Sequence, residues 1–206
     1  MLVELEGGTR VAGLRDGTPM RSGDLTIWPH FDSTLSLRVL ELHGRATLGN
    51  DDRDEVLFVL GEERSIYLPA GDSLPLQGEL TIISARVAAP ASGAGRTTAE
   101  AAAATQVQRT GDRWYVELIE AEVTQFIGGI PPGRAPDHFH LYEEVICILD
   151  GAGVMHAGAT STPIAAGSCI FLPRKQRHCV ENTGPGELRL LGVFYPAGSP
   201  AVRYPA

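Results

Sequence analysis

The chain has 206 residues, a formal net charge of −8, and a composition that is 43% hydrophobic and 20% charged. This length allows one large domain or two small ones, and the composition is that of an ordinary globular protein. No cluster of Lys and Arg predicts a nucleic-acid partner, and no apolar run approaches the roughly 20 residues that cross a membrane. The first residues lack a signal-peptide pattern, and three cysteines form no disulfide framework, so we expect a cytoplasmic protein.

Short apolar runs punctuated by Gly, Pro, Asp and Asn predict β-strands in the first part of the chain. The expected strands are Leu35–Leu42, Val56–Leu60, Ser65–Leu68 and Leu80–Val87. His30 and His43 lie in or beside this region, and we interpret both as packing or surface residues. Residues 88–110 are rich in alanine and poor in large apolar side chains, which predicts a linker, with a short helix capped by Thr97 or Thr98.

The same strand signals continue after the linker. The expected strands there are Trp114–Thr124, Val145–Leu149, Ser168–Leu172, His178–Glu181 and Leu188–Phe194. Many short strands with turn residues between them are typical of β-sandwiches and β-barrels, so the fold class is predicted to be all-β.

The two parts of the chain resemble each other weakly, in three segments that keep their order and approximate spacing. The first part contributes 54–61, 70–75 and 78–84, which match 143–151, 166–173 and 186–192. Self-similarity over such a long period indicates a tandem duplication. We therefore expect a first half (1–88), a linker (89–110) and a second half (111–206).

One group of residues in the second half has the composition of a metal site. His138 and His140 are two positions apart, so on a strand both side chains would lie on one face. Glu144 follows, and His178 lies on a later predicted strand. Three imidazoles and a carboxylate suit a divalent first-row metal ion, and an octahedral ion would keep two positions for other ligands. Ordinary surface or core histidines are the alternative.

The residues around this group resemble the two conserved motifs of the cupin superfamily. The stretch from Gly133 to Gly151 resembles the first motif, G-x(4–5)-H-x-H-x(3–4)-E-x(6)-G, and the stretch from Gly167 to Asn182 resembles the second, G-x(5)-P-x-G-x(2)-H-x(3)-N. Lys175 stands where the family usually has glycine, at a turn rather than at a ligand.

The resemblance implies two tandem jelly-roll (double-stranded β-helix) barrels joined by the short alanine-rich linker, as in bicupins. It places a metal at His138, His140, Glu144 and His178, inside the mouth of the second barrel. The first half departs from the motifs, because Asn50, Asp51, Asp52 and Arg53 stand near the expected histidines and 77–79 replace the last one. Glu55 is the candidate for the carboxylate position of the motif, and one such ligand does not hold a transition metal, so we expect a barrel without a metal that covers a sheet edge or forms an interface.

Several residues near the motifs are candidates for substrate contact or for orienting the ligands. The candidates for substrate contact are Arg134, Gln125, Tyr142 and Phe171. Asp137 and Tyr142 could also hold an imidazole in place by hydrogen bonds, with a solvent-facing turn as the equal alternative. Surface exposure for Arg134 and a core position for Phe171 are the ordinary alternatives.

Three functions are compatible with these features. The first is a metal-dependent oxidoreductase of dioxygenase type that acts on a small organic molecule, with iron or manganese favoured over zinc, nickel, cobalt or copper and with Glu144 as a catalytic base. The second is an isomerase, lyase or decarboxylase in which the metal acts as a Lewis acid. The third is a small-molecule-binding or sensing protein without turnover. A homodimer is a further expectation, because partner subunits often cover strand edges.

Overall fold

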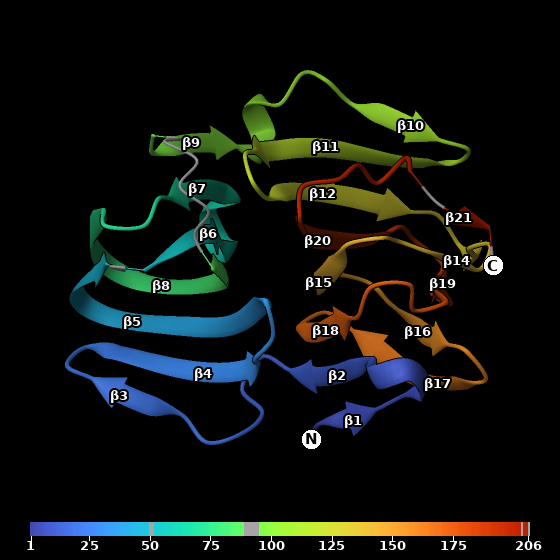
Figure 1. Cartoon of the computed structure of the whole chain (residues 1–206), viewed down its shortest axis with the longest axis horizontal. Coiled ribbons are helices and arrows are strands. Elements are labelled where there is room, and N and C mark those ends of the chain that lie inside the picture. Colours follow the sequence, from blue (N-terminus) through green and yellow to red (C-terminus); the bar gives the residue numbers. More distant parts are fainter. Residues whose placement is uncertain (50–51, 89–94, 203, 206) are drawn as a thin grey trace.

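The computed structural model describes residues 1–49, 52–88, 95–202 and 204–205, and almost all of its regular structure is β-strand (Figure 1). The strands form three antiparallel sheets. Within the described residues, the helices are three short 3₁₀ turns, η1 (Glu6–Gly8), η2 (Leu60–Glu62) and η3 (Ala101–Ala103). The all-β prediction is confirmed. Over the described part of the chain, no helix has the length and apolar character that crossing a membrane requires.

The first half forms a seven-stranded sheet that curls around one side of the molecule (Figure 1). In spatial order its strands are β3 (Met20–Ser22), β4 (Leu25–Phe31), β5 (Leu35–Gly49), β8 (Ser73–Ala88), β6 (Arg53–Val59), β7 (Arg64–Leu68) and β9 (Thr97–Glu100). The four strands predicted in the first half are confirmed, although β5 and β8 are much longer than expected. Asn50 and Asp51 lie outside the described residues.

The second half supplies most of two further sheets. The eight-stranded sheet runs β1 (Val3–Glu4), β2 (Arg10–Gly13), β18 (Ser168–Leu172), β15 (Glu143–Asp150), β20 (Leu188–Tyr195), β12 (Thr124–Ile130), β11 (Arg113–Glu120) and β10 (Gln108–Thr110). The six-stranded sheet contains β17 (Thr160–Ala165), β16 (Ala152–Ala157), β19 (His178–Asn182), β14 (His138–Phe139) and β21 (Tyr204–Pro205), with β13 (Gly133–Arg134) paired to β19.

The strand predicted over Trp114–Thr124 is wrong in its extent. β11 ends at Glu120 and β12 begins at Thr124, and these two residues face each other across a tight hairpin. The amide of Ala121 donates to the carbonyl of Val123 in the turn (2.9 Å). No Gly, Pro or Asn marks this turn, so the sequence reads as one continuous strand where the structure has two.

The seven-stranded and eight-stranded sheets have the same strand order. The order β3-β4-β5-β8-β6-β7-β9 corresponds to β10-β11-β12-β20-β15-β18-β2. The two end strands are exchanged between the sheets, because β2 belongs to the first half but pairs with β18, and β9, which lies in the segment predicted as a linker, pairs with β7. Thr97 and Thr98 therefore lie in a strand rather than at a helix start, and the one helical turn nearby is η3.

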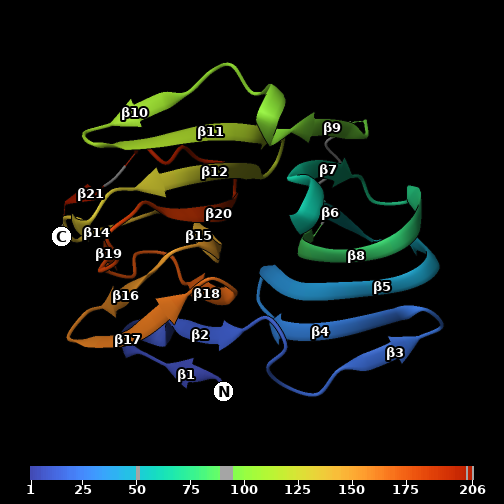
Figure 2. The ribbon, with the colours of Figure 1, turned by 180° about the vertical axis from the view of Figure 1, so that it is seen from behind.

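Three apolar clusters divide the interior. The largest lies between the seven-stranded and eight-stranded sheets and includes Phe31 and Phe58 from one side and Ile127 and Phe171 from the other. A second cluster lies between the two sheets of the second half, and a third lies on the inner face of the seven-stranded sheet. Each large sheet thus has an apolar cluster on both of its faces, and the view from behind shows the two halves packed side by side (Figure 2).

Candidate metal centre

Three histidines of the second half converge at one end of its two-sheet interior. Strands β14 and β19 pair so that His138 lies directly opposite His178, and His140 follows immediately after β14. One ligand atom from each of the three imidazoles lies within 4.8 Å of the others. Among the described residues, these form the one group of three or more His, Cys, Asp or Glu side chains close enough to share an ion.

Backbone carbonyls orient all three rings in the same way. The Nδ1 atoms of His138, His140 and His178 lie 3.0, 3.1 and 2.8 Å from the carbonyl oxygens of Pro136, Val202 and Gln176. A carbonyl oxygen only accepts, so each Nδ1 carries the proton and each Nε2 keeps its lone pair. Burial, and next the neighbouring His138, lower the pKa of His178 to about 3, so this ring is neutral at physiological pH. Neutral imidazoles held by their outer nitrogen are suited to binding a metal.

Glu144 completes the group from β15. Its Oε2 atom lies 3.7 Å from Nε2 of His140 and 3.7 Å from Nε2 of His178. This oxygen is buried and has no hydrogen-bond partner, and burial raises the pKa of Glu144 to about 8. A buried carboxylate oxygen without a donor is costly unless a cation meets it. The donor set of three imidazole nitrogens and one carboxylate therefore fits a divalent first-row ion.

A cavity of about 100 Å³ opens beside the histidines and Glu144. Its walls are largely apolar and include Phe126, Ile146, Leu190 and Phe194. The rings of Phe126 and Phe194 lie 4.9 Å apart. Gly192 allows this arrangement, because a Cβ atom there would lie 2.3 Å from the Phe126 ring. The cavity has room for a ligand of only a few heavy atoms.

The four candidates for substrate contact lie outside this cavity lining. Gln125 and Phe171 are on the opposite faces of their strands, where Phe171 contacts the first half through Phe31 at 6.0 Å between rings. Arg134 is exposed and pairs with Asp137 at 3.2 Å. Alternation along β12 explains why the Gln125 side chain points away from the cavity, because its neighbour Phe126 and Gly128 line the cavity.

Tyr142 lies behind His140 rather than in the cavity. Its ring stacks on the His140 ring with 4.9 Å between centroids and an angle of 14° between planes. Its hydroxyl donates to the carbonyl of Ser199 at 2.8 Å and also approaches the carbonyl of Val202. The Val202 carbonyl is the one that accepts the hydrogen bond from Nδ1 of His140. Tyr142 is thus placed to fix the orientation of His140, which is one of the interpretations that the sequence offers.

Asp137 links the two motif loops. Its carboxylate accepts from Arg134 and, at 2.8 Å, from Arg177 next to His178. Hydrogen bonds from Cys179 first, and then from the two arginines, lower the pKa of Asp137 to about 2. The ionised Asp137 therefore ties the loop before His138 to the loop before His178.

Sequence reasoning missed two parts of the site. Arg113 and Trp114 line the cavity from the start of β11, far from both motifs in sequence. The segment around Ser199 and Val202 supplies backbone carbonyls, which no side-chain pattern can reveal. The Thr110–Gly111–Asp112 turn before Arg113 was the available signal, because it returns the chain to the cavity mouth.

The part of the chain that contains the histidines is similar to known proteins. Residues 126–194 match the family model of the cupin domain. A protein of Thermotoga maritima named oxalate-binding protein is 39% identical over 67 residues, which are 32% of this chain and 55% of that protein. Auxin-binding protein 1 of Arabidopsis thaliana is 33% identical over 73 residues, 31% of this chain and 37% of that protein. The matched parts thus span about half or less of these curated relatives.

Solved structures resemble the whole chain and not only its cupin region. A protein of Pseudomonas aeruginosa described as glyoxylate-induced superposes with a TM-score of 0.77 and 15% identity, covering 97% of this chain and 93% of that one. A variant of oxalate decarboxylase from B. subtilis gives 0.71 and 11%, covering 92% and 78%. At these identities the likeness establishes the cupin fold alone. The jelly-roll closure of each half and the division at 89–110 stay predictions.

Proposed function

We propose that this chain is a metal-dependent cupin enzyme whose substrate is a small carboxylate. The observation that carries the proposal is the convergence of His138, His140 and His178 on the partnerless buried oxygen of Glu144, beside a small cavity. A divalent ion bound there supplies Lewis-acid or redox chemistry and open positions for an anionic oxygen ligand.

The charge of the surroundings supports an anionic substrate. Among the described residues that line the cavity, Arg113 is the one Lys or Arg and Glu144 the one Asp or Glu. With a divalent ion the site therefore carries excess positive charge. The apolar walls exclude water, which strengthens the attraction for a carboxylate, and a relative named for oxalate binding supports the same ligand class.

In this proposal the chain's own residues have distinct tasks. The three imidazoles and Glu144 hold the ion, Tyr142 keeps the His140 ring in place, and Arg113 at the mouth orients the carboxylate. Glu144 is also the group positioned to take up a proton from a bound substrate. Oxygen-dependent turnover is the first reaction class to test, and decarboxylation, isomerisation or elimination without oxygen is the alternative.

Metal content gives the first test. Protein purified from its native host is expected to contain one divalent transition metal ion per chain, measured by elemental analysis. His178→Ala removes a nitrogen ligand and is expected to lose the ion, whereas His43→Ala, on the exposed part of β5, is expected to retain it. Metal-free wild-type protein, or an unchanged metal content in His178→Ala, would overturn the metal centre.

Turnover of oxalate and other small carboxylates, followed under air and under nitrogen, tests the reaction class. Oxygen uptake with product formation supports a dioxygenase-type reaction, and equal turnover under nitrogen excludes it. A second candidate function is carriage of a small carboxylate without turnover, which the name of the Thermotoga maritima relative favours. Saturable binding with no product under either gas identifies that function.

A further inference from the structure

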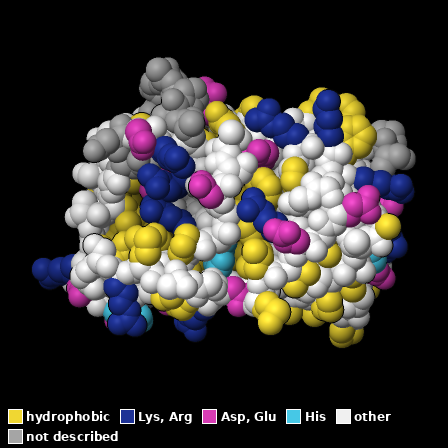
Figure 3. Space-filling view, turned by 60° about the horizontal axis from the view of Figure 1, so that its bottom comes forward, with side chains coloured by type: hydrophobic (Ala, Val, Ile, Leu, Met, Phe, Trp, Pro, Cys, Tyr) yellow, Lys and Arg dark blue, Asp and Glu magenta, His cyan; other side chains and the backbone are white. Residues whose placement is uncertain are grey.

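A second polar cluster lies inside the first half, far from the histidines in sequence. Arg38 of β5, Arg53 of β6 and Arg86 of β8 lie on the inner face of the seven-stranded sheet, together with Glu55. Alternation along the strands establishes the face, because Leu40, Leu57 and Ile82 occupy it as members of the inner apolar cluster. Figure 3 shows Lys and Arg side chains gathered with Asp and Glu on the side of the molecule that this sheet forms. We call Arg38, Arg53 and Arg86 the arginine cluster.

Glu55 is held at the bottom of this cluster. Its side chain is fully buried, and its Oε1 accepts from Nη2 of Arg38 at 2.6 Å and from the hydroxyl of Ser84. Nε of Arg38 donates to the Ser84 hydroxyl oxygen at 3.0 Å. Arg38, Glu55 and Ser84 therefore form a small hydrogen-bonded network in which each side chain contacts the other two.

Two buried polar atoms of Arg86 and Glu55 have no hydrogen bond. Nε of Arg86 and Oε2 of Glu55 are both buried, and neither has a hydrogen-bond partner. Among the described residues, the charges that act on Arg86 include those of Arg38 and Arg53 and, with the opposite sign, those of Glu55 and Asp52. Burial, and next the charge of Arg38, lower the pKa of Arg86.

Strand register places this cluster where the second half has its metal cavity. Glu55 faces Leu68 on one neighbouring strand and Arg86 on the other, and Glu144 in the same way faces Leu172 and Phe194. Arg86 therefore stands at the position of Phe194. One strand further, Ser36 faces Arg86 as Thr124 faces Phe194, which places Arg38 at the position of Phe126. Guanidinium groups thus replace the two aromatic walls of the metal cavity.

We propose that the arginine cluster is a second ligand site, which binds a small monocarboxylate anion. A guanidinium offers paired donors that match a carboxylate, and Nε of Arg86 is a buried donor in need of an acceptor. The partnerless oxygen of Glu55 repels a second negative charge, which disfavours phosphate and dicarboxylates. The site uses no metal, so it is independent of the function proposed for the second half.

Arginine side-chain NMR on the full-length, ¹⁵N-labelled protein tests this site, with acetate as the probe. The Nε–Hε resonances of Arg86 and Arg38, assigned from the Arg86→Gln and Arg38→Gln variants, are expected to shift saturably with acetate. Arg86→Gln is expected to weaken acetate binding by about ten- to hundredfold, since it removes a charged hydrogen-bond donor. Arg45→Gln, an exposed position on the same β5 strand, is the matched control and is expected to leave the affinity unchanged.

Two further variants keep the outcome clear. Arg38→Gln leaves the buried carboxylate of Glu55 without its cation and can unfold the protein. Arg86→Phe, which has the residue found at the matching position of the second half, therefore serves as the folded comparison. His178→Ala is expected to keep the acetate shift of Arg86, because the two sites are separate. Shifts that never saturate, equal binding by Arg86→Gln, loss of the shift in His178→Ala, or phosphate binding tighter than acetate would each overturn the proposal.

Discussion

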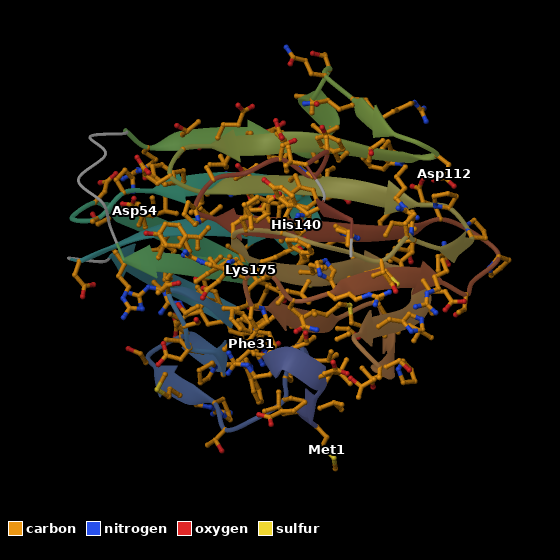
Figure 4. The ribbon with its side chains drawn as sticks, turned by 45° about the vertical axis from the view of Figure 1, so that its right-hand side comes forward. Met1, Phe31, Asp54, Asp112, His140 and Lys175 are labelled. Carbon is orange, nitrogen blue, oxygen red and sulfur yellow. The ribbon has the colours of Figure 1, made fainter. Side chains whose placement is uncertain are left out.

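Lys175 adopts a left-handed backbone conformation with a φ of 62°, at the turn before His178. Its amide donates to the carbonyl of His140 at 2.7 Å, so the turn connects the two histidine segments, and Figure 4 shows the two residues close together. This conformation is the physical reason that the second cupin motif has glycine here. In this chain the Cβ atom of Lys175 makes the same conformation less favourable.

Lys175→Gly is expected to raise the free energy of unfolding by roughly 0.5–1 kcal/mol, because glycine adopts this φ without strain and the lysine side chain is exposed. Urea unfolding measures the change. Arg174→Gly, one residue earlier and without a positive φ, is the control and is expected to lower stability by a similar amount. Equal losses in both variants would show that the turn at Lys175 is unstrained.

Glu144 predicts a pH dependence for metal-stripped protein. Its pKa is about 8 in the fold against 4.5 for an ordinary carboxyl, so as pH rises from about 5 to 8 the unfolded chain loses a proton that the folded chain keeps. Stability conferred by the protonated form is therefore lost with rising pH, by on the order of 1.4 kcal/mol per pH unit within this window.

The comparison of wild type with Glu144→Gln isolates this contribution, since glutamine does not titrate. Chelator-treated protein is unfolded with urea at several pH values between 5 and 8. The difference in unfolding free energy is expected to move against wild type as pH rises, and added metal is expected to remove the trend. A constant difference across the range would contradict the raised pKa.

Single residues divide into those that a sequence can reveal and those that it cannot. His138, His140, Glu144 and His178 stand at motif spacings, and the structure brings all four together. For Arg113 the turn at 110–112 is the one local signal, and strand pairing, which the sequence does not show, decides that this residue reaches the cavity. Gln125 illustrates the reverse error, since nearness in sequence to the motif does not decide which face of β12 a side chain occupies.

At the scale of elements, β15 serves both sides of its sheet. Glu144 lines the cavity, and its neighbour Glu143 points to the other face of the sheet. The carboxylate of Glu143 accepts from the hydroxyls of Ser33 (3.0 Å) and Thr34 (2.7 Å) and from the amide of Leu35 (2.8 Å). This one strand therefore connects the metal centre to the start of β5 in the first half.

Glu143→Gln is expected to lower the free energy of unfolding by about 1–2 kcal/mol, because the amide oxygen replaces only part of a charged acceptor that receives three hydrogen bonds. Chemical denaturation measures the loss. Glu120→Gln, at the exposed end of β11, is the matched control and is expected to change stability by less than about 0.5 kcal/mol. A Glu143 variant as stable as the control would show that this contact does not hold the halves together.

Local patterns located most central strands because apolar alternation and β-branched residues survive in any β context. The same patterns could not locate β1, β2 and β9, which are short strands at or next to a sheet edge with few large apolar residues. Their pairing is determined by which sheet edge lies nearby, and that is a property of the folded molecule.

At the scale of the whole molecule, an exchanged strand connects the two halves. β2 pairs with β18 of the second half, and the guanidinium of Arg10 lies 4.6 Å from the ring of Phe171 and 5.3 Å from that of Phe31. Arg189 adds a pair of hydrogen bonds to Glu63 (2.9 and 3.1 Å). The two halves therefore share covering strands, an apolar layer and ion pairs.

Removal of residues 1–13 is expected to leave the β18 edge and Phe171 uncovered, and to lower the thermal midpoint and promote aggregation. Size-exclusion chromatography and thermal melts check this outcome. A chain lacking only residues 1–2, which lie before β1, is the control and is expected to behave as wild type. A truncated chain that stays monodisperse with an unchanged midpoint would show that β1 and β2 are dispensable.

The pairing of Val11 with Ile170 also has a consequence for biosynthesis. Strand β18 is synthesised long after β2, so at 5–20 residues per second β2 waits on the order of ten seconds or more for its partner. During that interval β9 leaves the ribosome and becomes available to pair with β7. The order of translation thus favours completion of the seven-stranded sheet by β9 first, with closure of the histidine-bearing half later.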